Sequence, residues 1–276
     1  MTDITQPAAT PAMTDTNTTR LPGIPGLLGA QIAYQARLLL ANGRTVVVGL
    51  GLPVILLITA VSHGHVSALT AASRGSFGLT LTAWNTYGIR LVAAREAGIL
   101  KRWKATPLPR SAYFLARILA TMLVAVAAGA VTIAVGVLLY HTPITATAAL
   151  GVLIVFILGA AAWAATATAL TSIIPTVEAA GAIMIAIYFP VIIISGVVGQ
   201  ISEPHWLHTL ASYLPAQPVI HGATVALRYH AGSGPLLPAH DLIVLAAWAL
   251  GGLIAAVALF RWEPHRPTQR RPSRAR

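Results

Sequence analysis

Six long apolar runs divide the sequence, and each approaches the length that an α-helix needs to cross a lipid bilayer. A helix rises about 1.5 Å per residue, so about 20 apolar residues span the hydrocarbon core. Pro53 lies inside the first run and is compatible with a membrane helix, where neighbouring groups satisfy the backbone that proline disturbs. The pattern therefore predicts an all-α, polytopic membrane protein with six transmembrane helices. The predicted spans are residues 45–62, 75–89 with an extension at either end, 112–140, 146–173, 179–198 and 242–260.

The flanking segments are more polar and divide the chain into three parts. Residues 1–20 are rich in Thr, Ala and Pro and contain no apolar core, which predicts a disordered N-terminal tail rather than a signal peptide. Met1-Thr2-Asp3 recurs as Met13-Thr14-Asp15, so either methionine is a candidate natural start. Residues 21–262 are predicted to form the transmembrane domain, and residues 263–276 a basic tail that binds anionic lipid.

Two further segments have an amphipathic pattern that suits a membrane surface. Within residues 26–42, the polar side chains of Gln31, Gln35 and Asn42 share one stripe, which predicts an N-terminal interfacial helix before the first span. Residues 199–240 are too polar for a span but contain apolar and aromatic side chains of the kind found at an interface. These are Trp206, Leu207, Leu210, Tyr213 and Leu214.

The positive charges assign the sides of the membrane. Cytoplasmic loops of membrane proteins carry an excess of Lys and Arg. Sixteen of the 18 such residues fall in the first 44 residues, in the segment from Arg90 to Arg117 or in the C-terminal tail, and the exceptions are Arg74 and Arg228. With six spans, this pattern places both termini in the cytoplasm. Because the positive residues lie beside membrane spans, the net charge of +11 does not indicate nucleic-acid binding.

Composition supports the same class. The chain is 56% hydrophobic and only 9% charged, with a mean hydropathy of +0.75, which excludes an ordinary soluble domain. Arg greatly outnumbers Lys and Ala is abundant, which is typical of a GC-rich bacterial genome. The expected location is therefore the bacterial cytoplasmic membrane.

A basic segment between the second and third spans, residues 90–110, contains both lysines of the protein. It is predicted to be helical until Pro107 and Pro109, because five side chains recur on one helical face. That face consists of Val92, Glu96, Ile99, Leu100 and Trp103. Two interpretations are open: a solvated helix that lies on anionic headgroups and sets the topology, or a helix that docks into a cytoplasmic partner.

The order R-E-x-G-x-L-K-R-x-x-A-T-P-L-P in residues 95–109 resembles the cytoplasmic signature of the type-2 ABC exporter permeases, which export drugs, lipids and polysaccharides. The resemblance implies that this segment is the coupling helix that meets an ATPase subunit. Ile99 departs from the pattern, since the family usually has Thr there. The coupling residues implied in this chain are Glu96, Ile99, Leu100, Lys101, Arg102 and Trp103.

A second block, residues 189–228, resembles the same family from Phe189-Pro190 through Ser195-Gly196 to Arg228. The resemblance implies an external re-entrant segment of short helices that caps the transport path. It further implies a permease subunit that dimerises with itself or a similar chain, exports a hydrophobic or amphipathic drug, lipid or glycoconjugate, and so supports efflux and multidrug resistance. ATP and Mg would bind the partner ATPase, and this chain would need no cofactor.

Polar side chains inside the spans are candidates for the substrate path, because they are costly in lipid, and His221 in the re-entrant segment is a further candidate for contact with substrate. Each has a structural alternative, namely an interhelical hydrogen bond for Asn85 and a bond to local backbone for His221. Glu178 is the only acid that the predicted spans place near a membrane helix, and it is expected to complement the N-terminus of the fifth span. The substrate-path candidates are Thr82, Asn85, Thr86, Ser195 and His221.

Other functional classes find less support. The absence of Cys removes thiolate ligands, and His205 and His208 lack an accompanying acid motif, so no metal site is predicted. Neither Lys101 nor Lys104 follows a Gly-rich loop, so the chain has no P-loop and is not expected to be an enzyme. An ion- or proton-coupled secondary transporter would require midplane acids or repeats. An intramembrane enzyme would require a paired nucleophile and base.

Overall fold

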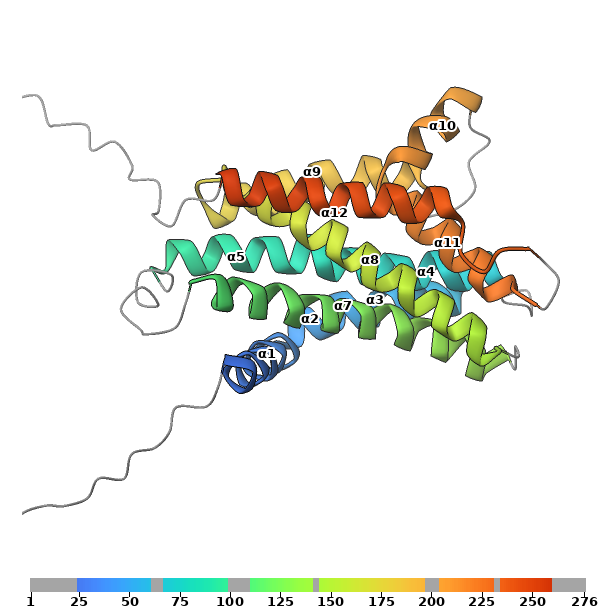
Figure 1. The fold of residues 1–276 in the computed structure, drawn as a ribbon, viewed down its shortest axis with the longest axis horizontal. Helices are drawn as coiled ribbons and strands as arrows, with labels where there is room; N and C mark the ends of the chain where they lie inside the picture. Colours follow the sequence, from blue (N-terminus) through green and yellow to red (C-terminus); the bar gives the residue numbers. More distant parts are fainter. Residues whose placement is uncertain are drawn as a thin grey trace, which may run out of the picture.

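The computed structural model describes residues 24–60, 67–98, 110–140, 144–196, 204–230 and 234–259, and within these residues all regular structure is helical. The long helices lie side by side in one bundle (Figure 1). The elements are α1 (Ile24–Leu40), α2 (Gly43–Val46), η1 (Val47–Gly51), α3 (Leu52–Ala60), α4 (Ala68–Leu81), η2 (Thr82–Thr86), α5 (Tyr87–Glu96), α7 (Arg110–Tyr140), α8 (Ala146–Thr171), α9 (Val177–Ile194), α10 (His205–Tyr213), α11 (Ala216–Arg228) and α12 (Ala239–Leu259).

The predicted polytopic membrane architecture is confirmed. Among the residues that the structure describes, four stretches are long and apolar enough to cross a bilayer: Leu115–Leu139, Ala146–Thr171, Val177–Ile194 and Ala239–Leu259. They correspond to the third, fourth, fifth and sixth predicted spans. In the two remaining predicted spans the described residues are helical as well, and each span contains a π-helical turn.

The π-helical turn of the first span, η1, ends at Gly51, two residues before Pro53. The amide N–H of Leu52 donates to the carbonyl of Val47, five residues earlier, and Leu52 then continues into α3. Proline has no N–H with which to continue an α-helical ladder, so a local change of helix type is a usual way to accommodate it. In the second span η2 joins α4 to α5, and helix therefore runs from Ala68 to Glu96.

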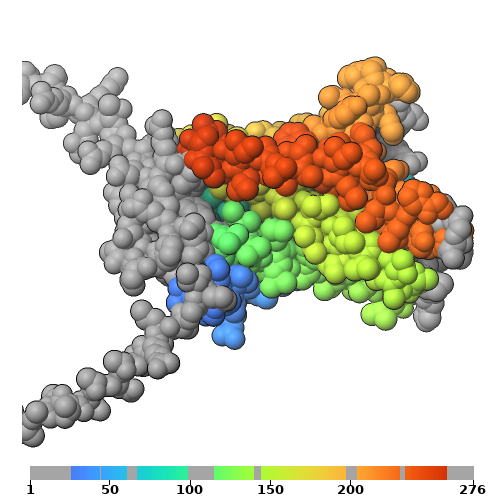
Figure 2. Space-filling model, viewed as in Figure 1, coloured from blue at the N-terminus to red at the C-terminus, as the bar shows by residue number. Residues whose placement is uncertain are grey.

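The centre of the bundle is α8, of which 61% of the most apolar stretch is buried, against 22% for α9 and for α12. Small residues let neighbouring helices approach α8 closely. A Cβ added at Gly159 of α8 would lie 2.6 Å from Val219 of α11. A Cβ added at Gly252 of α12 would lie 2.7 Å from the backbone of Thr166 in α8. Large side chains fill the rest of the core, including Tyr87, Phe156 and Met184. Figure 2 shows α12, α8 and α7 forming one face of the body.

Helix α1 lies across the long axis of the bundle, as an interfacial helix should (Figure 1). It packs on α7 through Ala36 and Leu39, which meet Ala120 and Val124. The C-terminal ends of α5 and α12 lie at the same end of the bundle as α1, and α10 lies at the opposite end (Figure 1). We refer to these as the α1 end and the α10 end.

Two short helices, α10 and α11, occupy the segment predicted to be re-entrant. Helix α11 is packed into the bundle, with Val219 and Ala223 fully buried. Helix α10 projects from the bundle (Figure 1) and leaves Trp206, Leu210 and Tyr213 between 48% and 66% exposed. The exposed aromatic and apolar side chains fit an interfacial position.

Candidate functional site

Three of the substrate-path candidates, Thr82, Asn85 and Thr86, lie together in η2. Thr82 is 1% exposed and packs on Gly49 of η1, where an added Cβ would lie 2.6 Å from the Thr82 hydroxyl. Asn85 and Thr86 are half-buried. The hydroxyl of Thr82 and the Oδ1 atom of Asn85 are buried without a hydrogen-bond partner among the described residues. Because a buried unsatisfied oxygen is destabilising, these two atoms stand out from the apolar packing around them.

Aromatic side chains pack η2 and the end of α4 against the neighbouring helices α8 and α9. The indole N–H of Trp84 donates to the carbonyl of Met184 in α9 over 2.9 Å, and its ring meets Trp163 of α8 edge-on at 5.3 Å between centroids. Tyr188 of α9 contacts Trp163 at 5.7 Å, and its hydroxyl shares a 2.8 Å hydrogen bond with Thr80. Edge-to-face pairs of this kind add specificity to apolar burial. The second span is therefore held against both α8 and α9 by specific side-chain contacts.

At the α1 end, Arg95 of α5 is 3% exposed and binds the C-terminal turn of α8. Its guanidinium donates to the carbonyls of Thr171 (3.0 Å) and Ser172 (3.3 Å), and also to the carbonyl of Ile174. The last carbonyls of a helix have no intrahelical donor and carry a partial negative charge. Arg95 therefore caps α8 with a buried cation.

The next residue, Glu96, binds the following helix in the chain. Its Oε2 atom accepts a 3.0 Å hydrogen bond from the amide N–H of Val177, in the first turn of α9. Thr176 caps the same helix through a bond from the amide of Ala179. We call Arg95 and Glu96, with the α8 and α9 ends that they bind, the Arg95–Glu96 link.

The sequence prediction of one helical face running from Val92 to Trp103 is wrong at Gly98. Helix α5 ends at Glu96, and Gly98 has φ +67°, a conformation that glycine adopts easily and that ends a helix. Val92 and Glu96 therefore do not share one uninterrupted helix with residues beyond Gly98. The predicted coupling residues Ile99, Leu100, Lys101, Arg102 and Trp103 lie outside the described residues.

At the α10 end, His221 of α11 binds Asp241 in the first turn of α12. The Nδ1 atom of His221 lies 2.7 Å from Oδ2 of Asp241, and His240 lies 3.4 Å from Oδ1. The hydrogen bond to Asp241 raises the pKa of His221; partial burial opposes this, and the negative charge of Asp241 adds to it. The expectation that Glu178 is the only acid near a span is wrong, because Asp241 is 3% exposed inside the sixth helix. Glu178 itself lies in the first turn of α9, as expected.

The five substrate-path candidates do not form one cluster. Ser195 follows the last residue of α9, and its hydroxyl donates to the carbonyl of Val191 over 2.6 Å. His221 lies in α11 and reaches a carboxylate instead of local backbone. The roles of these residues in a path stay predictions. No group of three His, Cys, Asp or Glu side chains suited to a metal ion occurs in the part of the chain that the structure describes.

Sequence reasoning overlooked two contributors to these sites. Arg95 begins the cytoplasmic signature but is not among the predicted coupling residues, and Asp241 has no predicted role, because it falls between the segment 199–240 and the sixth predicted span, 242–260. For Asp241 a signal existed: an acid one residue before an apolar run of helical length occupies the first turn, where the helix dipole favours it. The three-dimensional partner of Arg95 lies 76 or more positions away in the chain.

The comparison with known families covers these sites. A family model described as ABC-2 family transporter protein matches residues 76–259 of the 276-residue chain. No curated protein matches the chain. The matched region contains η2, the Arg95–Glu96 link and the pair His221–Asp241. The chain therefore belongs to the ABC-2 family of transporter proteins, as a multi-pass membrane permease of an ABC transporter.

Proposed function

We propose that the chain is the permease subunit of an ATP-driven exporter in the bacterial cytoplasmic membrane. Its substrate is a hydrophobic or amphipathic drug, lipid or glycoconjugate. Two copies, or this chain and a similar one, form the pathway, with the α1 end and both termini in the cytoplasm. The chain is a transport subunit and not an enzyme, and a separate ATPase chain binds ATP and Mg.

The sequence supports a separate energy source. A phosphate-binding P-loop requires a lysine after a Gly-rich loop. The two lysines, Lys101 and Lys104, fall in the basic segment instead, between the second and third spans. Hydrolysis on a partner chain must then act on this permease mechanically, through a contact surface.

The Arg95–Glu96 link is the observation that carries the proposal. Residues 95–109, which resemble a coupling helix, begin with Arg95 and Glu96, so a displacement of the residues that follow pulls on this pair. Their hydrogen bonds pass the displacement to the ends of α8 and α9. Along the span, Gly88 abuts Met184 of α9, and Trp84 binds the same residue's carbonyl, so α5, η2 and α9 are coupled over their length.

The test is reconstitution with an ATPase chain encoded beside this one. We expect the two chains to co-purify, and the complex in proteoliposomes to move a lipophilic dye or fluorescent lipid only with ATP and Mg. The isolated permease should neither bind nor hydrolyse ATP. Robust hydrolysis by the isolated chain, or transport that needs no ATPase, would overturn the proposal.

One observation favours a second candidate, a proton-coupled carrier. Asp241 is a buried acid with a titratable partner, His221, inside the transmembrane domain. Carriers of that kind place their coupling groups near the bilayer midplane, however, and Asp241 lies in the first turn of α12, at the α10 end. Dissipating the proton gradient with an uncoupler distinguishes the two, because ATP-driven export in proteoliposomes should be unaffected.

A further inference from the structure

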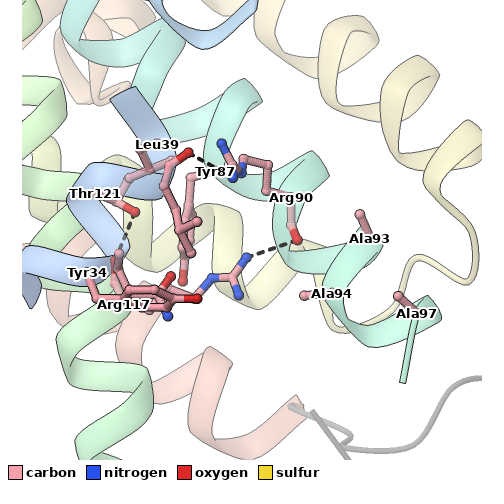
Figure 3. A pocket seen from close by; sticks show the side chains of 11 residues that line it. Tyr34, Leu39, Tyr87, Arg90, Ala93, Ala94, Ala97, Arg117 and Thr121 are labelled. Atoms are coloured by element: carbon pink, nitrogen blue, oxygen red, sulfur yellow. Dashed lines mark hydrogen bonds between the residues drawn. The ribbon is translucent and has the colours of Figure 1, made fainter. Parts of the chain in front are cut away.

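A pocket of about 380 Å³ lies at the α1 end, between α1, α5 and α7 (Figure 3). A volume of this size is within the range of small-molecule sites, about 300–1,000 Å³. Helix α1 contributes Tyr34 and Leu39, α5 contributes Tyr87 and Arg90, and α7 contributes Arg117. None of the three polar groups proposed for transport in η2 lines this pocket.

Two guanidinium groups dominate the charge of the pocket. Its described lining includes Arg90 and Arg117 and no carboxylate. Arg117 donates to the backbone carbonyl of Arg90 over 2.9 Å, and its guanidinium carbon lies 6.0 Å from the centre of the Tyr87 ring. The tyrosine face and the carbonyl hold Arg117 in place beside the second cation.

Arg90 is weakly engaged by its present acceptors. Its Nη1 atom lies 3.5 Å from the Thr45 hydroxyl, and its Nη2 atom lies 3.3 Å from the carbonyl of Leu38. Both distances exceed the usual upper limit of about 3.2 Å for an N–H···O bond, and both acceptors are uncharged. A half-buried guanidinium with long, neutral hydrogen bonds gains most from an anionic acceptor.

The planar fork of arginine matches the oxygens of a phosphate group, and an anion between two such forks offsets their mutual repulsion. Helix α1, which forms one wall, crosses the bundle axis and leaves the apolar side chains Leu38 and Leu40 between 40% and 49% exposed. Such a wall lies at the level of lipid headgroups. Basic pockets between membrane helices suit anionic lipid headgroups.

We propose that the pocket between α1, α5 and α7 binds a phosphate-type anion, held by Arg90 and Arg117 and supplied by the phosphodiester headgroup of an anionic phospholipid. The bound headgroup joins the interfacial helix to the second and third spans, less than two turns from the Arg95–Glu96 link along α5. The inference depends on neither the direction of transport nor the identity of the exported substrate.

The experiment uses the full-length chain purified in neutral detergent. Three probes are compared: micelles containing phosphatidylglycerol, micelles containing phosphatidylcholine, and sodium phosphate in lipid-free micelles. The readouts are the thermal unfolding midpoint and the lipid retained in native mass spectrometry. We expect phosphatidylglycerol to raise the midpoint and to be retained, and phosphatidylcholine to do neither to the same extent.

Four variants locate the effect. Arg90→Gln and Arg117→Gln should each weaken phosphatidylglycerol retention about tenfold, as loss of a charged hydrogen-bond donor predicts. Arg37→Gln is the matched control, since it removes an exposed charge of α1 that does not line the pocket. It should bind as the wild type does. Ala93→Phe keeps both guanidiniums and fills part of the pocket, so it tests the site even where an arginine variant folds poorly.

The outcomes separate the sources. A midpoint rise with phosphatidylglycerol alone supports a lipid, and an equal rise with sodium phosphate supports the anion site with a soluble phosphate compound as its source. Equal retention of phosphatidylglycerol and phosphatidylcholine by the wild type overturns the proposal. So does a loss in Arg37→Gln as large as in Arg90→Gln, or full retention in Arg90→Gln, Arg117→Gln and Ala93→Phe.

Discussion

Two neighbouring residues of opposite charge, Arg95 and Glu96, each bind the helix terminus of opposite partial charge. The cation meets the C-terminal carbonyls of α8, and the carboxylate meets an N-terminal amide of α9. The pairing uses the macrodipoles of two consecutive helices to fix the turn between them.

Replacing Arg95 should destabilise the turn between α8 and α9, because this one side chain donates to several backbone carbonyls. In Arg95→Gln the carbonyls of Thr171 and Ser172 lose a charged donor, and we expect unfolding to become easier by about 1.5–3 kcal/mol. Arg95→Lys should recover only part of the loss, because an ammonium lacks the planar fork that reaches several carbonyls. Denaturant unfolding in mixed micelles measures the difference, with Arg37→Gln as an exposed-charge control. A wild-type unfolding curve for Arg95→Gln would contradict the capping role.

The pair His221–Asp241 should make stability depend on pH. The pKa of His221 is raised above its ordinary value of 6.5, chiefly by the hydrogen bond to Asp241. Its stabilisation is therefore fully present below about pH 6.5 and is lost as the pH rises through the raised pKa. His221→Gln should remove this loss, whereas His208→Gln on the exposed helix α10 should keep it. Unfolding midpoints from pH 5.5 to 8.5 test the pair, and parallel curves for wild type and His221→Gln would reject it.

At the scale of elements, close approach of α12 to α8 depends on one glycine of an adjacent pair. A Cβ at Gly252 would lie 2.7 Å from the Thr166 nitrogen and 2.9 Å from the Ala165 carbonyl carbon, both of which are backbone atoms. A Cβ at Gly251 meets nothing within 4 Å. Small residues at such crossings let membrane helices pack closely.

The two alanine variants should therefore differ in sign. Gly252→Ala must push α12 away from α8 and should destabilise the fold by about 1–3 kcal/mol. Gly251→Ala only restricts the unfolded backbone and should be neutral or stabilising by up to about 1 kcal/mol. Thermal unfolding of both variants is the measurement. Equal destabilisation by both would show that helix packing does not distinguish the two positions.

The positions of the long helices could be predicted from the sequence, because a membrane span is recognised by its length and apolar content. The third and fourth spans, predicted at 112–140 and 146–173, agree with α7 and α8 within two residues at each end. The π-helical turn η2 could not be predicted from the sequence. It contains no proline or glycine and is stabilised by the packing of Trp84 against α8 and α9. The end of the helix before Gly98 could not be predicted either, because the helical pattern of apolar residues continues in the sequence past Gly98, which has a positive φ.

The candidate sites could be predicted from the sequence less well than the helices, because the sequence identifies polar residues in spans one at a time and does not show which of them lie together. Asn85 and Thr82 are candidates from the sequence alone, and each has a side-chain oxygen with no hydrogen-bond partner in the part of the chain that the structure describes. The partners of Arg95, Arg90 and His221 come from other helices and cannot be read from local spacing. Long-range partners of this kind require the packing of the whole bundle.

At the scale of the whole molecule, the orientation in the membrane is open to a direct test, because the chain has no cysteine. Single cysteines at Pro175, in the exposed turn between α8 and α9, and at His208 on α10 mark the two ends of the bundle. Because positive residues gather in the first 44 residues, the basic segment and the tail, we expect the Pro175→Cys label only from the cytoplasm. The His208→Cys label should react only from outside. Reaction of both from one side would reject the topology.

Coupling to an ATPase is the property of the assembled transporter that the basic segment should control, and it should depend on apolar contact more than on any one charge. An aromatic anchor in a cleft contributes about 2 kcal/mol or more, whereas an exposed charge at a rim contributes less than about 1 kcal/mol. Trp103→Ala should therefore weaken ATPase recruitment and abolish transport while membrane insertion persists, and Lys104→Ala should change little. If the segment lies on lipid instead, pooled loss of Lys101, Arg102 and Lys104 should matter most and Trp103 should alter only membrane affinity. Co-purification of the ATPase with each variant separates the two, and unchanged recovery and transport in Trp103→Ala would exclude its docking role.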